Sequence, residues 1–211
     1  MQDSNSFSDL QYQIESAVTI IKNCGVVAIP TDTLYGLAAS AFEESAVEKI
    51  FKLKGRPNSM AIPLIIAEPN DINKWAINIP EITWDLTKHF WPGALTIILE
   101  RNPKIPHYLG GDPNTIGFRV SNHLVPTSIA RSLGVPITGT SANRSGGPNL
   151  ETIKSMKTEF GDKIDMIVEK GEKPRGLSST VIDLTKKYPR ILRNGEIPKE
   201  ALETVCNSKF S

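Results

Sequence analysis

Hydrophobic and polar positions along this chain follow two patterns, one typical of buried strands and one typical of amphipathic helices. Continuous apolar runs rich in β-branched residues predict buried strands, at residues 25–29, 62–67, 94–99, 115–120, 135–140, 166–169, 180–184 and 190–193. Apolar residues spaced three and four apart predict helices, at residues 8–22, 43–53, 80–90, 124–133, 150–160 and 198–206. This alternation predicts an α/β fold, with a βαβ-like unit over residues 115–140.

The first predicted strand ends in a cluster of polar side chains. After Ile29 come Pro30, Thr31, Asp32, Thr33, Tyr35 and Gly36. Ligands bind beyond the carboxyl ends of strands in open α/β sheets. A turn capped by Thr and Asp explains the same residues without a ligand, and the pattern leaves both interpretations open.

Two basic residues, Lys54 and Arg56, end the helix predicted over residues 43–53. As solvated charges, they would interact favourably with the negative end of the helix dipole. However, Pro57 stops the helix directly after Arg56 and restricts its backbone. Together with the polar strand end, the two cations could form an anion pocket.

Further candidate features lie in the second half of the chain. Arg119 is the one cation in the strand 115–120, where it could equally be an edge or exposed residue. Residues 139–148, rich in Ser, Asn and Gly, could let backbone N–H groups approach an anion or form a simple turn. The irregular segment 101–114 is long enough to suggest a functional loop.

Composition excludes several classes of protein. With 211 residues, 39% hydrophobic and 22% charged, the chain suits one soluble globular domain. A net charge of +1 provides no general attraction to nucleic acid or membranes. Cys24, Cys206 and three scattered histidines predict neither a disulfide framework nor a metal site. The sequence contains no membrane-spanning run and no signal peptide, so we expect a cytoplasmic protein.

Seven short motifs, taken together and in order, resemble one family. They are Pro-Thr-Asp-Thr-Leu-Tyr-Gly-Leu at 30–37, Lys-Gly-Arg-Pro at 54–57, Trp-Pro-Gly at 91–93 with Leu-Thr at 95–96, Arg-Val at 119–120, Ser-Ala-Asn at 141–143 with Ser-Gly at 145–146, Ser-Thr-Val-Ile-Asp at 179–183 and Leu-Arg-Asn-Gly at 192–195. Over about residues 10–200 the chain resembles the YrdC/TsaC family of threonylcarbamoyl-AMP synthases. The most specific part is the Lys-x-Arg motif followed by Ser-x-Asn.

The resemblance implies a twisted, mixed α/β sheet around a deep concave cleft in a single domain. We expect a loose segment at residues 1–7, a YrdC-like domain at 8–207 and no additional C-terminal domain. The implied activity is that of a nucleotidyltransferase, which condenses L-threonine, bicarbonate and ATP to threonylcarbamoyl-AMP and pyrophosphate. A separate transferase machinery would then use this product to modify adenosine 37 of tRNA. The family also suggests double-stranded RNA binding, here a contact with tRNA.

The resemblance also implies roles for individual residues. The residues expected at the catalytic centre are Lys54, Arg56, Ser141 and Asn143. The residues expected to bind ATP are Lys54, Arg56, Met60, Thr115, Gly139, Asn143, Asn149 and Arg193. The residues expected to bind threonine are Thr33, Tyr35, Arg119, Ser141 and Ser179. Mg²⁺ is expected with the triphosphate, without a protein ligand that the sequence identifies.

Two positions depart from the family pattern: Met60 replaces the Lys or Asn of many members, and Ile65 replaces the His of some. Two other functions are compatible with parts of the sequence. One is a carbamoyl-phosphate-dependent adenylating protein of the hydrogenase-maturation type, which would normally be a much longer chain. The other is an RNA-binding protein using the same basic cleft, although a charge of +1 and 7% aromatic residues are low for that role.

Overall fold

The strands form two mixed β-sheets, one smaller and one larger, in the middle of the molecule. The computed structural model describes residues 2–207 and 209, with side chains from residue 8 onward. The smaller sheet has the order β8 (Thr140–Ser141), β2 (Gly36–Ala38), β1 (Val27–Ile29) and β9 (Met166–Ile167). Within it, β1 pairs antiparallel with β2 and parallel with β9.

The larger sheet carries the remaining strands. Its order is β11 (Arg190–Arg193), β10 (Thr180–Asp183), β5 (Leu95–Arg101), β6 (Thr115–Arg119), β3 (Leu64–Ile65) and β7 (Ile137–Thr138), with β4 (Ala76–Ile77) pairing with β5. The pairs β10–β5 and β3–β6 are parallel, and the other pairs are antiparallel. The predicted mixed α/β architecture is therefore confirmed, with its strands divided between two sheets.

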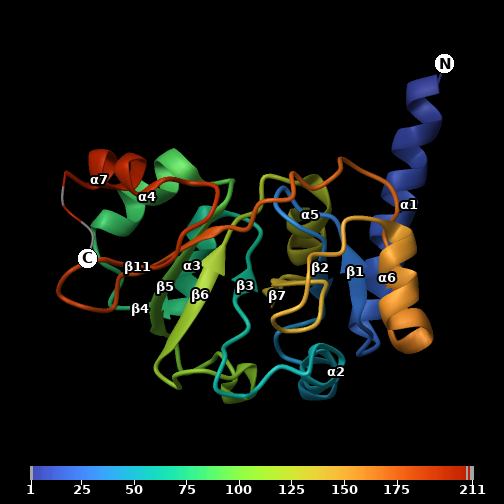
Figure 1. Cartoon of the computed structure of the whole chain (residues 1–211), viewed down its shortest axis with the longest axis horizontal. Helices are drawn as coiled ribbons and strands as arrows, with labels where there is room; N and C mark the ends of the chain where they lie inside the picture. Colours follow the sequence, from blue (N-terminus) through green and yellow to red (C-terminus); the bar gives the residue numbers. More distant parts are fainter. Residues whose placement is uncertain (1, 208, 210–211) are drawn as a thin grey trace.

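Helices cover both sheets (Figure 1). Those near the smaller sheet are α1 (Gln2–Lys22) and α6 (Ile153–Phe160), and those near the larger sheet are α3 (Ile72–Trp75), α4 (Ile82–Phe90) and α7 (Lys199–Cys206). The helix α5 (Leu124–Leu133) packs against α1 and against β3 and β7 of the larger sheet. The helix α2 (Glu44–Lys54) ends at Gly55, which has a φ of 55°. Short 3₁₀ helices cover Pro69–Asp71, His107–Leu109 and Gly161–Lys163. In the described chain, no helix is long and apolar enough to cross a membrane.

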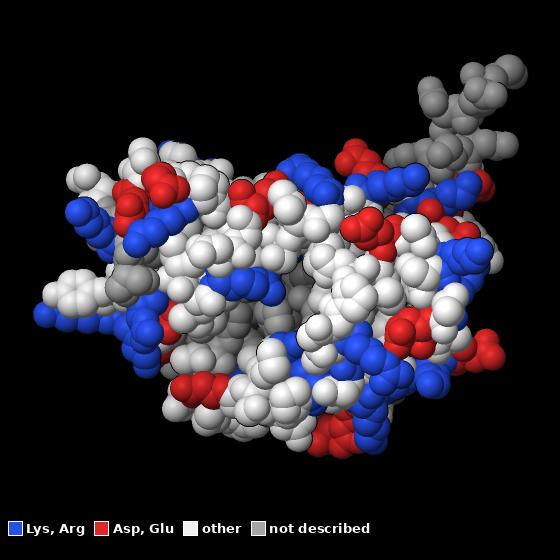
Figure 2. Space-filling view, in the orientation of Figure 1, with Lys and Arg blue, Asp and Glu red and all other residues white. Residues whose placement is uncertain are grey.

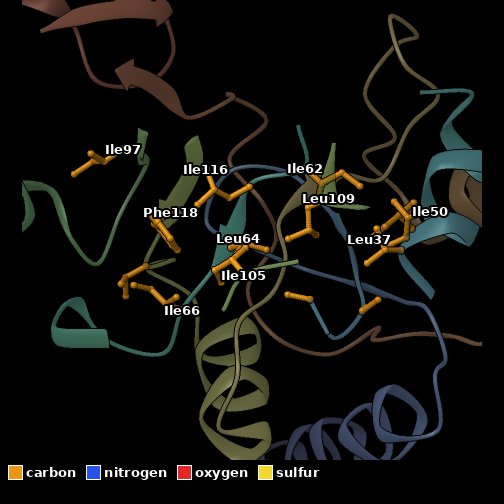
Figure 3. Close-up of a cluster of buried hydrophobic side chains, with 14 of the residues drawn as sticks. Leu37, Ile50, Ile62, Leu64, Ile66, Ile97, Ile105, Leu109, Ile116 and Phe118 are labelled. Carbon is orange, nitrogen blue, oxygen red and sulfur yellow. The ribbon is translucent and has the colours of Figure 1, made fainter. Parts of the chain in front are cut away.

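The main core lies on the larger sheet and extends towards α2. Phe118, Leu64 and Ile97 are fully buried, and Leu37 and Ile50 extend the same cluster towards β2 and α2 (Figure 3). A second cluster joins the apolar stripe of α1 to α5 and to β1. Burial of these side chains supplies the main stabilisation, at about 1.5–3 kcal/mol for each large aliphatic or aromatic side chain.

A glycine divides the strand that was predicted over residues 135–140. Gly139 separates β7 from β8, and its N–H donates to the Pro63 carbonyl at 2.7 Å. A Cβ at this position would lie 2.9 Å from Ile65 Cγ1 and 3.3 Å from the Pro63 oxygen. Only glycine therefore allows the chain to pass so close to β3 as it moves from one sheet to the other.

Three local predictions differ from the structure. The helix α1 begins at Gln2, within the segment that the sequence predicted to be loose, because no Gly or Pro interrupts it there. The predicted βαβ-like unit is wrong: β3 lies between β6 and β7, and it is parallel to β6 but antiparallel to β7. The short strands β2 and β4 were not predicted, since two or three residues are too few to show a periodicity.

Candidate functional site

A cavity of about 240 Å³ lies between the two sheets. Figure 2 shows a hollow in this face of the molecule, with Lys and Arg atoms on its rim. Eight of the residues predicted from the sequence line the cavity, namely Thr33, Tyr35, Arg56, Arg119, Gly139, Ser141, Ser179 and Arg193. The structure therefore brings together residues from six separate parts of the chain.

Arg119 lies at the end of β6 and is held by three hydrogen bonds. Its Nε donates to the Gly93 carbonyl at 2.9 Å, and Nη1 donates to Thr33 Oγ1 at 2.8 Å. Its Nη2 donates to Asp32 Oδ1 at 2.5 Å. The side chain is almost completely buried, so the alternative of an exposed strand residue is wrong. Because a guanidinium has five N–H groups, two remain for a ligand in the cavity.

The turn after β1 positions Thr33 and Asp32. Thr31 Oγ1 donates to the Leu34 carbonyl at 2.7 Å and accepts from the Thr33 N–H at 3.1 Å. The interpretation as a hydroxyl-capped turn is thus correct for Thr31. The same turn nevertheless places Thr33 in the cavity wall and Asp32 against Arg119.

Arg56 lines the cavity from the turn after α2. Its Nε donates to the Met60 carbonyl at 3.1 Å, and Nη2 donates to the Ala61 carbonyl at 2.7 Å. These two bonds fix the plane of the guanidinium while leaving other N–H groups for a ligand. The alternative of a fully solvated helix-end charge does not describe this half-buried side chain.

Lys54 has a different environment from Arg56, although only one residue separates them. Its side chain is buried, and Nζ donates to the carbonyls of Ser141 at 2.5 Å and Asn143 at 2.7 Å. A third contact, at 3.3 Å, reaches Asn143 Oδ1. An ammonium has three N–H donors, so these oxygens use all of them. Lys54 therefore organises the loop that follows β8 and does not line the cavity.

Asn143 belongs to the same loop network. Its Oδ1 accepts from Ser141 Oγ at 2.7 Å, and its Nδ2 donates to the Gly147 carbonyl at 2.7 Å. The Ser145 N–H donates to the Lys54 carbonyl at 2.8 Å. Of this loop, Ser141 faces the cavity while Asn143 is buried behind it.

Arg193 and Ser179 form the wall on the side of β10 and β11. Arg193 Nε donates to the Ser179 carbonyl at 3.0 Å, and Nη2 donates to Ser179 Oγ at 2.8 Å. Ser179 Oγ also lies 2.8 Å from Thr96 Oγ1. Thr96 lines the cavity but was not predicted; its signal in the sequence is a lone hydroxyl within the apolar run of β5.

The charges around the cavity are mainly positive. Burial lowers the pKa of Lys54 to about 8, with Arg56 as a further cause. Burial and Arg193 lower the pKa of Arg56, and burial and Arg119 lower the pKa of Arg193. Burial would raise the pKa of Asp32, but Arg119 and Ser121 outweigh it, so the pKa falls and the carboxylate stays charged. An excess of neighbouring cations favours a bound anion.

Several predicted residues lie outside the cavity wall, namely Lys54, Met60, Thr115, Asn143 and Asn149. Met60 and Asn149 are exposed, and Thr115 lies at the start of β6. The Thr115 carbonyl accepts from Arg101, whose guanidinium also bonds to the carbonyls of Pro106, Gly110 and Asp112. Arg101 thus organises the long segment 101–114, which does not line the cavity.

No metal centre is apparent in the described part of the chain. There, no group of three or more His, Cys, Asp or Glu residues could hold a metal ion. The donors around the cavity are guanidinium, hydroxyl and backbone groups, which suit anions and not cations.

The sequence is similar to several curated proteins. A family model described as telomere recombination, Sua5/YciO/YrdC, matches residues 19–195. The threonylcarbamoyl-AMP synthase of Pyrococcus abyssi (strain GE5 / Orsay) is 37% identical over 195 residues, which are 92% of this chain and 57% of that protein. A putative threonylcarbamoyl-AMP synthase of Mycobacterium tuberculosis is 33% identical over 192 residues, covering 91% of this chain and 88% of that protein. The chain thus spans little more than half the length of the first of these relatives.

Solved structures show the same relationship. The crystal structure of P. abyssi Sua5 complexed with L-threonine superposes with a TM-score of 0.89 at 36% identity, covering 94% of this chain and 58% of that one. E. coli YciO gives a TM-score of 0.83 at 26% identity, covering 91% of this chain and 93% of that one. HypF, at 18% identity, shares the fold alone. On the matching model and these relatives, the chain belongs to the Sua5/YciO/YrdC family.

Proposed function

We propose that this protein is an L-threonylcarbamoyladenylate synthase, which converts L-threonine, bicarbonate and ATP into threonylcarbamoyl-AMP and pyrophosphate. The observation that carries the proposal is the distribution of charge in the cavity. One arginine of the cavity wall is paired with a carboxylate, and two others have no carboxylate partner among the described residues. The relatives named threonylcarbamoyl-AMP synthase, and the relative whose structure contains L-threonine, support the same assignment.

Arg119 would bind the carboxylate of threonine. Two of its five N–H groups have no partner among the described residues, and a guanidinium binds a carboxylate by hydrogen bonds that are both charge-assisted and directional. Thr33, Tyr35, Ser141 and Ser179 would complete the threonine pocket with hydroxyl groups. Ile65 contributes an apolar part of the same wall, so the methyl group of threonine has a surface to contact.

Arg56 and Arg193 would bind the phosphates of ATP. Each guanidinium is already fixed by two hydrogen bonds to the protein, so little rotational freedom is lost when an anion binds. Lys54 and Asn143 would act as positioning residues for Ser141 and the loop after it. Met60, Thr115, Gly139 and Asn149 stay proposed nucleotide contacts, and Met60 can contribute only apolar contact.

The chemistry requires no activated nucleophile from the protein. The amine of threonine attacks bicarbonate to form a carbamate, and water leaves. A carbamate oxygen then attacks the α-phosphorus of ATP, and the bond to the β-phosphate oxygen breaks to release pyrophosphate. Negative charge gathers around the α-phosphorus, so the cationic side chains would accelerate this step by electrostatic stabilisation and alignment.

Two parts of the proposed function do not depend on the residues of the cavity: the binding of magnesium and the later use of the product. Mg²⁺ would enter with the triphosphate as part of the substrate, because this cation binds phosphate oxygens and needs few protein ligands. The product would pass to the machinery that modifies adenosine 37 of tRNA.

Pyrophosphate release tests the proposal directly. ATP turnover should require threonine and bicarbonate together, and the purified product should contain threonine, one carbonyl carbon and AMP in equal amounts. Equal pyrophosphate release with either substrate omitted would contradict the proposal. A response to carbamoyl phosphate in place of bicarbonate would favour the hydrogenase-maturation type of activity.

A further inference from the structure

Asp32 is a buried carboxylate that sits behind the cavity wall. Its side chain is only 3% exposed, and Oδ1 accepts two hydrogen bonds, from Arg119 Nη2 and from Ser121 Oγ. Its other oxygen, Oδ2, is buried without a hydrogen-bond partner among the described residues. Burial of a charge raises the free energy of the folded protein unless an opposite charge is paired with it, and here Arg119 is that opposite charge.

Ser121 reaches this carboxylate from outside the cavity. It lies two residues beyond Arg119 and lines a separate open groove of about 910 Å³, whose wall also contains Pro92, Asn122 and His123. Ser121 does not line the cavity that holds Arg56 and Arg119. A substitution at Ser121 can therefore alter the Asp32–Arg119 pair without removing any group that could touch a substrate.

We propose that Asp32, held in place by Ser121, is a positioning residue that sets the orientation of the Arg119 guanidinium towards the carboxylate of the amino-acid substrate. The inference rests on the proposed synthase function. With Nη2 bound to Asp32, Nη1 to Thr33 and Nε to Gly93, the plane of the guanidinium is fixed from three sides. The guanidinium, which lines the cavity, then keeps one orientation.

Asp32 also makes the proposed amino-acid site different in charge from the proposed nucleotide site. A carboxylate next to Arg119 offsets its charge, so the amino-acid site attracts a monoanion less strongly but discriminates against phosphate, which carries more charge. The orientation and the charge of Asp32 thus act in opposite directions on threonine affinity. Orientation dominates, because the carboxylate bond depends on the alignment of both N–H groups.

Steady-state kinetics and calorimetry on four variants test this inference. Ser121→Ala should raise the KM for threonine about threefold to tenfold, the range for loss of one hydrogen bond. The kcat at saturating threonine and the Kd for ATP should stay within about twofold of the wild type, since neither depends on binding the carboxylate. Ser121→Thr keeps the hydroxyl and should restore the KM. Asn122→Ala, an exposed neighbour in the same groove, is the matched control.

Asp32→Asn tests the charge itself. We expect its threonine KM to rise about tenfold or more, and we expect inorganic sulfate to compete with threonine more strongly than in the wild type. A merely structural role for Asp32 would not alter this competition. If Asp32→Asn does not fold, the Ser121 variants decide the question alone.

The outcomes separate this inference from the proposed function. A wild-type protein that binds no threonine contradicts the proposed function. A wild-type protein that binds threonine, with an unchanged or lower KM in Ser121→Ala, overturns the positioning role of Asp32. A loss of ATP affinity equal to the loss of threonine affinity also overturns it, because the variant would then have disturbed the cavity as a whole.

Discussion

Two parts of the cavity wall stabilise their cations by different means. In the paired part, Arg119 is buried against the carboxylate of Asp32. In the unpaired part, Arg56 and Arg193 bond, among the described residues, to neutral groups: the carbonyls of Met60 and Ala61 and the carbonyl and hydroxyl of Ser179. The charge of Arg119 is offset by Asp32, and the charges of Arg56 and Arg193 are not. A protein with a net charge of +1 can thus present a locally positive cavity wall.

Hydrogen bonds to carbonyl oxygens allow buried cations to stay charged without a carboxylate partner. The ammonium of Lys54 and the guanidinium of Arg101 both rest on carbonyls, and both are buried. A carbonyl satisfies a donor without neutralising the charge. The positive potential of Lys54 therefore reaches the neighbouring cavity, while its N–H groups are used to shape the loop.

The largest effect is expected in the unpaired part of the wall. Arg56→Ala should remove about 2–4 kcal/mol of transition-state stabilisation, the range for loss of a preorganised charged donor. Measurement of kcat/KM for ATP would show this as a fall of about 30-fold to 1,000-fold. Arg56→Lys is the matched control, since it retains the charge but loses the bonds to Met60 and Ala61. Normal activity in Arg56→Ala would mean that this residue is only a helix-end charge.

The paired part of the wall should respond to a change in the shape of its cation more than to a change in charge. Arg119→Lys keeps a cation but removes the planar donor pair, so the KM for threonine should rise tenfold or more, equivalent to about 1.5–3 kcal/mol. The affinity for ATP, measured calorimetrically without threonine, should change little. If both ligands weaken together, Arg119 supports β6 and the cavity as a whole, and its assignment to threonine should be withdrawn.

Much of the fold and of the cavity could be predicted because the signals are local. The apolar runs at β1, β5 and β10 and the stripe of α2 each predict their element, and polar groups follow β1 and β8 as expected. The resemblance to the family also named Arg56, Arg119 and Arg193, which no periodicity connects and which the structure places in the wall of one cavity.

The remaining features depend on contacts between distant residues. From the sequence, Lys54 and Arg56 were predicted to have the same role. A turn of the backbone at Gly55 instead directs Lys54 towards the loop after β8 and Arg56 into the cavity wall. Asp32 was seen as a polar residue of the strand end, without its pairing to Arg119 from β6. The order of β6, β3 and β7 could not be predicted either, because β3 has only two residues.

The smallest effect concerns the pH dependence of stability at Lys54. Burial lowers its pKa from 10.5 to about 8 in the folded protein. Between these values the unfolded chain binds more protons than the folded chain, so the free energy of unfolding gains a contribution that rises with pH. Below about pH 8 both states are protonated and the contribution is flat.

Urea unfolding of the wild type and of Lys54→Met at several pH values between 7 and 10 would measure this contribution. The unfolding free energy of the wild type minus that of Lys54→Met should grow by up to about 1 kcal/mol per pH unit above pH 8. Lys52→Met, which removes an exposed ammonium from the same helix, controls for the change in total charge. At pH 7 Lys54→Met should also bind ATP more weakly, since three loop oxygens lose their donor. A difference that falls with pH would mean that the carbonyls stabilise the ammonium of Lys54 more than burial destabilises it.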